Sequence, residues 1–285
     1  MDRIIPIFGF FIGYSIIAYI LTIIVHPPPE LTRKDKKDYF GQHLSIIHAY
    51  TAVIMCLGIY VYEGGIHYNK ETRLEHVIAV GVRYKQNSLG YFIFDTIYAE
   101  YYKLHDGAMR FHHIFAFLAL ITMYLSELGG SASVVGLLIT EISNPCVLKR
   151  HILRAKGNEE SFSYSLYENL FIFLFIAGRI VYGTWYIYKV WKSKINWGYK
   201  LMSSSVYSVS WFWVFVILSK ALKKYNSTED PSIKRLISIT KYFRQNKALL
   251  LTFIIFISFA IPGILTQALQ LDIFDDKDDK GFKVI

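Results

Sequence analysis

The apolar stretches of this sequence contain ionisable side chains that could take part in chemistry. Adjacent His112 and His113 stand near the start of one stretch, Asp95 lies within a shorter one, and Arg179 lies at the centre of a long one. A charged side chain costs about 2.5–3.5 kcal/mol at the middle of a bilayer, so such groups usually face a bundle interior and have a partner. We therefore expect Arg179 to pair with a carboxylate, either Asp95 or Glu141.

The two adjacent histidines are the candidate catalytic residues. An imidazole can take a proton from an amine or a hydroxyl near neutral pH, so His112 or His113 could be a general base. Neighbouring residues on a helix point about 100° apart, so the pair cannot face one ligand together, and we expect no metal site from it. Asp95 and Glu141 would orient the base or balance the charge of Arg179. A capping or interfacial role is the simpler alternative for a histidine at a helix start.

Aromatic and polar residues share one face of the segment around Asp95. Tyr91, Asp95, Tyr98 and Tyr102 follow a three- and four-residue spacing, which places them on one side of a helix. We expect this face to point inward, so that Tyr91 and Tyr98 join a polar network around a cavity. A purely structural ion-pair network that fixes the helix register explains the same residues equally well.

Long apolar helices must position these residues. The chain has 285 residues, of which 53% are hydrophobic, and this is more apolar material than one soluble core would bury. A bilayer core about 30 Å thick needs roughly 20 apolar residues per helix. We predict an all-α, polytopic transmembrane bundle of seven or eight helices. The segments cover approximately residues 4–25, 42–62, 88–102, 111–128, 131–144, 168–190, 203–222 and 248–267.

Prolines and small residues indicate how the segments end and pack. Three consecutive prolines, Pro27 to Pro29, stop the first helix, because they offer no amide donors. Pro145 is expected to end the fifth segment, which is short for a straight crossing and would be tilted or enclosed. Gly9 and Gly13 form a small-residue pair that permits close approach of another helix.

Charge and cysteine content restrict the possible partners. The net charge is +9, and the basic residues lie between the apolar segments, which favours contact with anionic lipid headgroups over nucleic acid. Cys56 and Cys146 are far apart and indicate neither a disulfide framework nor a thiolate metal site.

Several motifs, in this order and spacing, resemble the TLC-domain (TRAM-LAG1-CLN8) family, above all its small TLC-domain-containing membrane proteins. The resemblance covers approximately residues 40–224. Its motifs are Ser45–Ala49, Gly90–Asp95, His112-His113, Glu141–Pro145 followed by Arg150, Arg179, and Ser210-Trp211.

The family resemblance implies a six-helix core around a membrane-embedded cavity and a role in sphingolipid or phospholipid homeostasis. In ceramide synthases, a paired histidine and a later His-Asp-x-x-Asp element serve acyl transfer from acyl-CoA to a sphingoid amine. His112-His113 matches the pair, but the second element falls on Thr140–Asn144, which has no histidine. The resemblance thus suggests acyl-CoA as a substrate and no cofactor, includes Asn144 in the polar network, and does not decide whether the chain is an enzyme.

We expect three parts in the chain. Residues 1–39 would hold an N-terminal transmembrane helix and a proline-rich linker, residues 40–224 the TLC domain, and residues 225–285 a basic loop, another transmembrane helix and an acidic tail. The parts outside the core could dock other proteins. The alternative to a lipid-binding or lipid-modifying protein is therefore a noncatalytic accessory subunit that retains the fold and a bound lipid.

The two functions imply different membranes and partners. The resemblance favours the endoplasmic reticulum, and the accessory-subunit alternative favours the mitochondrial inner membrane. Membrane lipids are expected partners in both cases, other membrane subunits only in the second, and nucleic acid in neither.

Overall fold

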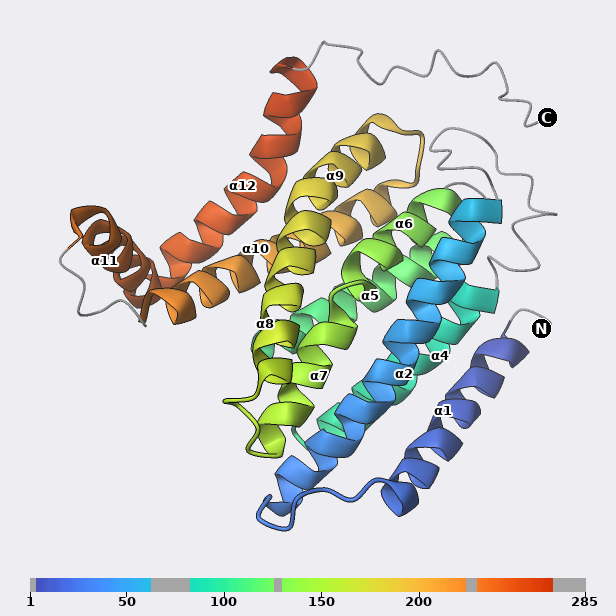
Figure 1. Ribbon diagram of the computed structural model, residues 1–285. Helices are drawn as coiled ribbons and strands as arrows, with labels where there is room; N and C mark the ends of the chain where they lie inside the picture. Colours follow the sequence, from blue (N-terminus) through green and yellow to red (C-terminus); the bar gives the residue numbers. More distant parts are fainter. Residues whose placement is uncertain (1–3, 63–82, 126–129, 224–229, 269–285) are drawn as a thin grey trace, which may run out of the picture.

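The computed structural model describes residues 4–62, 83–125, 130–223 and 230–268, and the regular structure of these residues is helical (Figure 1). The predicted acidic tail and most of the polar loop after the second segment lie outside the described residues. The helices are α1 (Ile5–Ile24), α2 (Arg33–Tyr62), α4 (Arg83–Tyr101), α5 (Gly107–Leu125), α6 (Gly130–Glu141), α7 (Asn144–Ala155), α8 (Phe162–Leu174), the π-helical η2 (Phe175–Tyr182), α9 (Gly183–Lys192), α10 (Trp197–Lys223), α11 (Pro231–Gln245) and α12 (Lys247–Ala268).

The chain is an integral membrane protein with an all-α bundle, as predicted. Six stretches of the described residues are long and apolar enough to cross a bilayer: 5–24, 33–61, 107–125, 132–155, 162–192 and 197–222. The predicted third segment is helix α4, which is not among the six and packs against α1, α2 and α5. The predicted eighth segment lies in α12, whose described apolar part, residues 247–258, is shorter.

A second helix begins at the proline that was expected to end the fifth segment. Helix α6 ends at Glu141, and α7 begins at Asn144 with Pro145 in its first turn. A proline there loses no intrahelical hydrogen bond, because the first amides of a helix have no partner within it. The helix thus ends before Pro145, as predicted, but the following helix α7 was not predicted. Residues 132–155 together form one stretch of 24 residues that is long and apolar enough to cross a bilayer.

A π-helical turn interrupts the long crossing over residues 162–192. Ser161 caps its start, since its hydroxyl accepts a hydrogen bond from the Tyr164 amide at 3.1 Å. The π-helical turn, η2, contains Arg179 near its centre. Such turns re-aim the side chains that follow them and are frequent at functional sites.

Helix α1 packs closely against α4 at Gly90, a glycine of α4. A Cβ atom on Gly90 would lie 2.6 Å from the Phe10 Cβ and 2.9 Å from the Ile7 carbonyl oxygen, whereas a Cβ on Gly9 or Gly13 would meet nothing within 4 Å. The close approach predicted for Gly9 and Gly13 therefore does not form among the described residues, and Gly90 supplies it instead.

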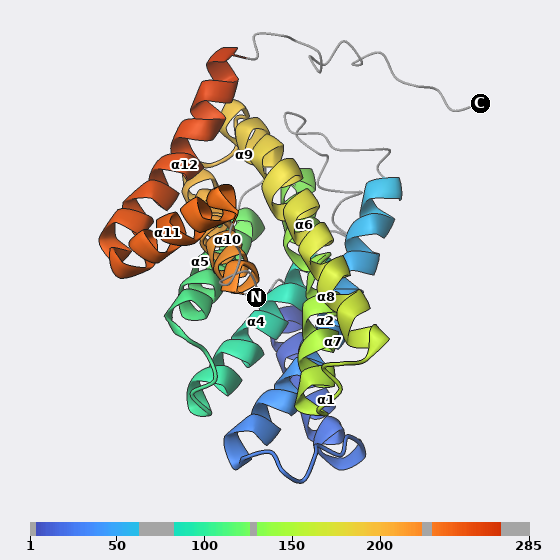
Figure 2. The ribbon, with the colours of Figure 1, turned by 60° about the vertical axis from the view of Figure 1, so that its left-hand side comes forward.

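Helices α11 and α12 stand to one side of the bundle, next to α10 and α9 (Figures 1 and 2). The basic stretch that was predicted as a loop thus contains a helix. Asp230 begins α11, because its carboxylate accepts hydrogen bonds from the Ser232 and Ile233 amides at 2.8 and 3.3 Å. Buried apolar clusters form elsewhere in the bundle, one of them where side chains of α5, α6, α9 and α10 pack together and another between α1, α2, α4 and α5.

Candidate functional site

A cavity lies at the centre of the bundle, lined by residues of α4, α5, α6, η2, α9 and α10. The cavity has a volume of about 80 Å³. On the same measure, a cavity that holds a single water needs roughly 10–15 Å³. Most of its wall is apolar or bears a hydroxyl group, and its charged or imidazole side chains are His112, Glu141 and Arg179. The cavity can therefore hold an apolar molecule that carries one polar group.

Arg179 is buried beside this cavity and lacks partners for part of its guanidinium. Its Nη2 donates to the Thr140 carbonyl and, at 3.0 Å, to the Asn144 Oδ1. The guanidinium carbon lies 5.2 and 5.5 Å from the ring centres of Phe175 and Trp213. Its Nε and Nη1 are buried with no hydrogen-bond partner among the described residues. A buried charge in this state is costly unless a ligand completes its hydrogen bonds.

Asn144 connects Arg179 to a carboxylate. Its Nδ2 donates to the Glu141 Oε2 at 2.9 Å, and its Oδ1 accepts from Arg179. The carboxylate partner expected for Arg179 is thus reached through an amide, at Glu141. Asp95, the other candidate, belongs to a different group of residues.

The two adjacent histidines point to different places, as their spacing predicts. The His112 ring lines the cavity and meets the Trp213 ring edge-on, with centroids 5.1 Å apart. His113 turns away from the cavity, and its Nδ1 lies 3.3 Å from the Asp95 Oδ2. Only His112 can therefore contact a molecule inside the cavity directly.

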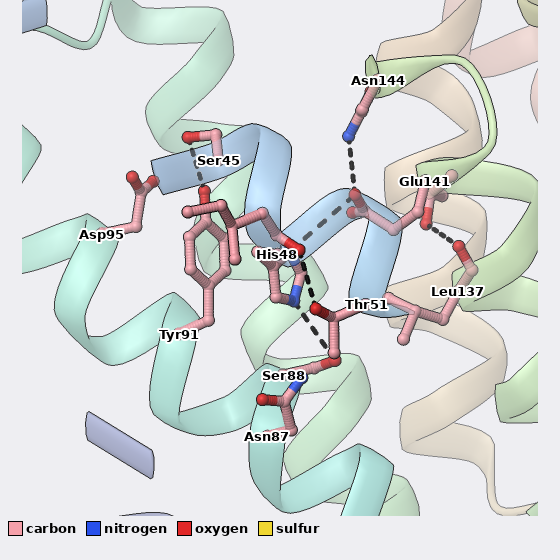
Figure 3. A network of polar contacts seen from close by, with 12 residues as sticks. Ser45, His48, Thr51, Asn87, Ser88, Tyr91, Asp95, Leu137, Glu141 and Asn144 are labelled. Carbon is pink, nitrogen blue, oxygen red and sulfur yellow. Dashed lines mark hydrogen bonds and ion pairs between the residues drawn. The ribbon is translucent and has the colours of Figure 1, made fainter. Parts of the chain in front are cut away.

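A second histidine reaches the cavity wall from α2 (Figure 3). The Nδ1 of His48 lies 4.0 Å from the Glu141 Oε2, and its Nε2 lies 3.4 Å from the Ser88 hydroxyl. Tyr91 stacks on the His48 ring and donates to the Ser45 hydroxyl at 2.8 Å. His48 was not among the predicted site residues, although a histidine within an apolar segment gives the same signal as Arg179.

The remaining predicted residues do not line the cavity. Tyr91 holds His48, Asn144 joins two cavity residues, and the Tyr98 hydroxyl donates to the Lys37 carbonyl at 2.9 Å. Of the eight predicted residues, His112, Glu141 and Arg179 are the ones that face the cavity. The predicted residues are therefore divided between the cavity wall and the packing of the helices around it.

One further histidine lies beside Asp95, in the connection between α4 and α5. The Nε2 of His105 is 3.7 Å from the Asp95 Oδ2, and its ring centroid is 4.4 Å from that of His113. Burial lowers the pKa of the His105 imidazole from its ordinary value, against the opposing charge of Glu100. The neutral form, which can accept a proton or bind a metal ion, is thereby favoured.

Comparison with known proteins identifies the domain that contains the cavity. The family model for the TLC domain matches residues 41–222, a range that includes the whole lining of the cavity. No solved structure matches the chain.

Proposed function

Since the chain belongs to the TLC-domain (TRAM-LAG1-CLN8) family and is an integral membrane protein, we propose that it binds a membrane lipid in the central cavity. The lipid's hydrocarbon lies along the apolar wall formed by residues such as Phe92, Leu120 and Val206. Its carbonyl or phosphate oxygens lie at the end where Arg179, Glu141 and His112 gather.

The unpartnered guanidinium nitrogens of Arg179 are the observation that carries this proposal. A structural arginine would use its donors on the protein, as Arg150 does when it donates to the Glu168 carboxylate at 2.9–3.0 Å. Arg179 leaves Nε and Nη1 unused beside an apolar cavity. A lipid oxygen would satisfy these donors, and its attached chain would fill the cavity.

His112 is the proton acceptor if the lipid is also modified. Its ring faces the cavity, and its Nδ1 is buried with no hydrogen-bond partner among the described residues. It could take the proton of a lipid amine or hydroxyl as that group attacks the thioester carbonyl of an acyl-CoA. The carbon–sulfur bond would then break, and the imidazole would return the proton to the departing CoA thiolate, which leaves an amide or ester and free CoA. His113 is excluded from this direct role, because it faces Asp95.

Filling the cavity tests the proposal. Ala119 lines the cavity, whereas Ala221 is exposed on α10. We expect the protein extracted in mild detergent to carry a defined lipid in native mass spectrometry, and Ala119→Phe to remove it. Ala221→Phe, the matched control, would keep it. Equal lipid content in both folded variants would contradict the proposal.

The accessory-subunit alternative predicts a different outcome of the same measurement. Helix α12 packs on α9 and α10 and exposes apolar side chains such as Phe253 and Phe256, which could contact another membrane subunit. Stoichiometric subunits that co-purify with the chain, with no lipid that depends on Ala119, would favour this alternative over the lipid-binding protein.

A further inference from the structure

Asp95, His105 and His113 converge at the end of α4 where the chain turns into α5. One ligand atom from each residue lies within 4.8 Å of the other two. The group is separate from the central cavity, whose lining includes none of the three. It combines one carboxylate with two imidazoles, a set of donors that binds divalent transition metals.

The two distances from Asp95 to the histidines are longer than most hydrogen bonds and close to those between the ligands of a zinc ion. The Asp95 Oδ2 lies 3.3 Å from the His113 Nδ1 and 3.7 Å from the His105 Nε2. A hydrogen bond would hold these atoms at about 2.7–3.2 Å. Two ligands of a tetrahedral zinc ion, with bonds of about 2.0–2.2 Å, lie roughly 3.3–3.6 Å apart.

His113 provides an independent indication of a missing ligand. The residue is 9% exposed and its side chain 11%, and its Nδ1 is buried with no hydrogen-bond partner among the described residues. The same atom lies 3.3 Å from the Asp95 Oδ2, and the His113 ring lies beside the His105 ring. A metal ion between the three groups would satisfy this nitrogen.

The turn that brings His105 back to α4 is fixed on both sides. At the end of α4, the Leu104 amide donates to the Ala99 carbonyl and the Lys103 amide to the Glu100 carbonyl, with Lys103 at φ 53°. This is a Schellman motif. Asp106 then caps α5, because its carboxylate accepts from the Met109 amide at 2.8 Å. His105 stands between these two motifs and is therefore held in place before any ligand binds.

A salt bridge on the outside of the turn adds to this rigidity. The Arg110 Nε lies 2.6 Å from the Glu100 Oε1 and so joins the start of α5 to the end of α4. His105 is the most exposed of the three ligands, with 14% of its side chain accessible. An ion could reach the site from that side.

From this geometry we propose that Asp95, His105 and His113 bind one Zn²⁺ ion, with a fourth coordination position left open. Three protein ligands plus an open position is the pattern of zinc sites that hold a water or a substrate. The ion also joins α4 to α5 through their connection. The site stands apart from the lipid proposal, and either can fail without the other.

Cobalt provides a direct probe of the site. We would prepare the full chain with a histidine-free tag, strip it with chelator and titrate it with Co²⁺, which occupies zinc sites and colours them. We expect one Co²⁺ per chain with the visible bands of a low-coordinate site, displaced by Zn²⁺. A stripped wild-type protein that binds no Co²⁺ or Zn²⁺ stoichiometrically, or that binds Fe²⁺ and excludes Zn²⁺, would overturn the proposal.

Variants of His105 test whether this residue is a ligand of the metal ion. His105→Gln should weaken Zn²⁺ binding at least about tenfold, whereas His26→Gln, which changes an exposed histidine outside the group, should leave Zn²⁺ binding unchanged. His105→Cys should restore binding and add a thiolate-to-cobalt charge-transfer band. Because wild-type Cys56 and Cys146 lie elsewhere, this band would be absent before the substitution. Unchanged Zn²⁺ affinity in folded His105→Gln, or binding by His105→Cys without the new band, would contradict the assignment.

Discussion

The imidazole of His48 stacks on the phenol ring of Tyr91, with centroids 3.7 Å apart and planes 7° from parallel. His48 comes from α2 and Tyr91 from α4, so the stack joins two helices in the interior of the bundle. Its position brings the His48 Nδ1 to 4.0 Å from Glu141. The stack therefore links the packing of the bundle to one wall of the cavity.

Two substitutions of Tyr91 separate the contribution of its ring to stability from that of its hydroxyl. Tyr91→Phe keeps the stack and loses the hydrogen bond to Ser45, and we expect it to cost about 1 kcal/mol of unfolding free energy. Tyr91→Ala also removes the ring from a buried site and should cost roughly 3–5 kcal/mol. Unfolding in detergent, followed by circular dichroism, measures both. Equal losses in the two variants would show that the stack contributes little.

The contact of α1 with α4 can be tested at Gly90. A Cβ there would press on the Phe10 Cβ and on backbone atoms of α1, so Gly90→Ala should lower the thermal stability. Gly58→Ala in α2 is the matched control, because a Cβ at that position meets nothing within 4 Å. It should be neutral or stabilising by up to about 1 kcal/mol, since alanine favours a helix interior. If Gly90→Ala were as stable as Gly58→Ala, the close contact of α1 with α4 at Gly90 would be contradicted.

The left-handed backbone at Lys103 predicts a stabilising substitution. A non-glycine residue at φ 53° is strained, and relief of this strain by Lys103→Gly should contribute up to about 1 kcal/mol. The converse control is Gly157→Ala, because Gly157 has φ 72° with open space around its Cβ position. That change should be destabilising. Thermal unfolding measures both effects, and a loss of stability in Lys103→Gly would contradict the Schellman motif.

The role of Arg179 predicts a loss of lipid affinity that depends on its donors. A hydrogen bond to a charged group contributes about 1.5–3 kcal/mol when its partner is buried. Arg179→Leu should therefore weaken lipid binding by roughly tenfold to a hundredfold. Arg235→Leu changes an exposed arginine on α11 and should have no effect. Titration of the delipidated variants with a fluorescent phospholipid measures the difference, and equal affinities would remove Arg179 from the site.

The sequence predicted the bundle and the inward-facing charges for one physical reason. An ionisable group in an apolar helix must avoid lipid, so the inward positions of Arg179, Glu141 and His112 follow from hydropathy. Which small residue makes a helix contact depends on the face that meets the neighbour, and Gly9, Gly13 and Gly90 look alike in sequence. The position of His105 beside Asp95 could not be predicted from helical periodicity, because it depends on the left-handed backbone at Lys103.

The position of a bound lipid chain tests the central claim most directly. A phospholipid with a photoreactive group on its acyl chain would be incorporated with the protein into vesicles, irradiated, and the crosslinked peptides mapped by mass spectrometry. We expect crosslinks on cavity residues of α5, α6 and α10, such as Ala116, Leu137 and Val206, and their loss in Ala119→Phe. Crosslinks confined to exposed residues such as Phe173 and Val181, at the same yield in Ala119→Phe, would contradict lipid binding in the cavity.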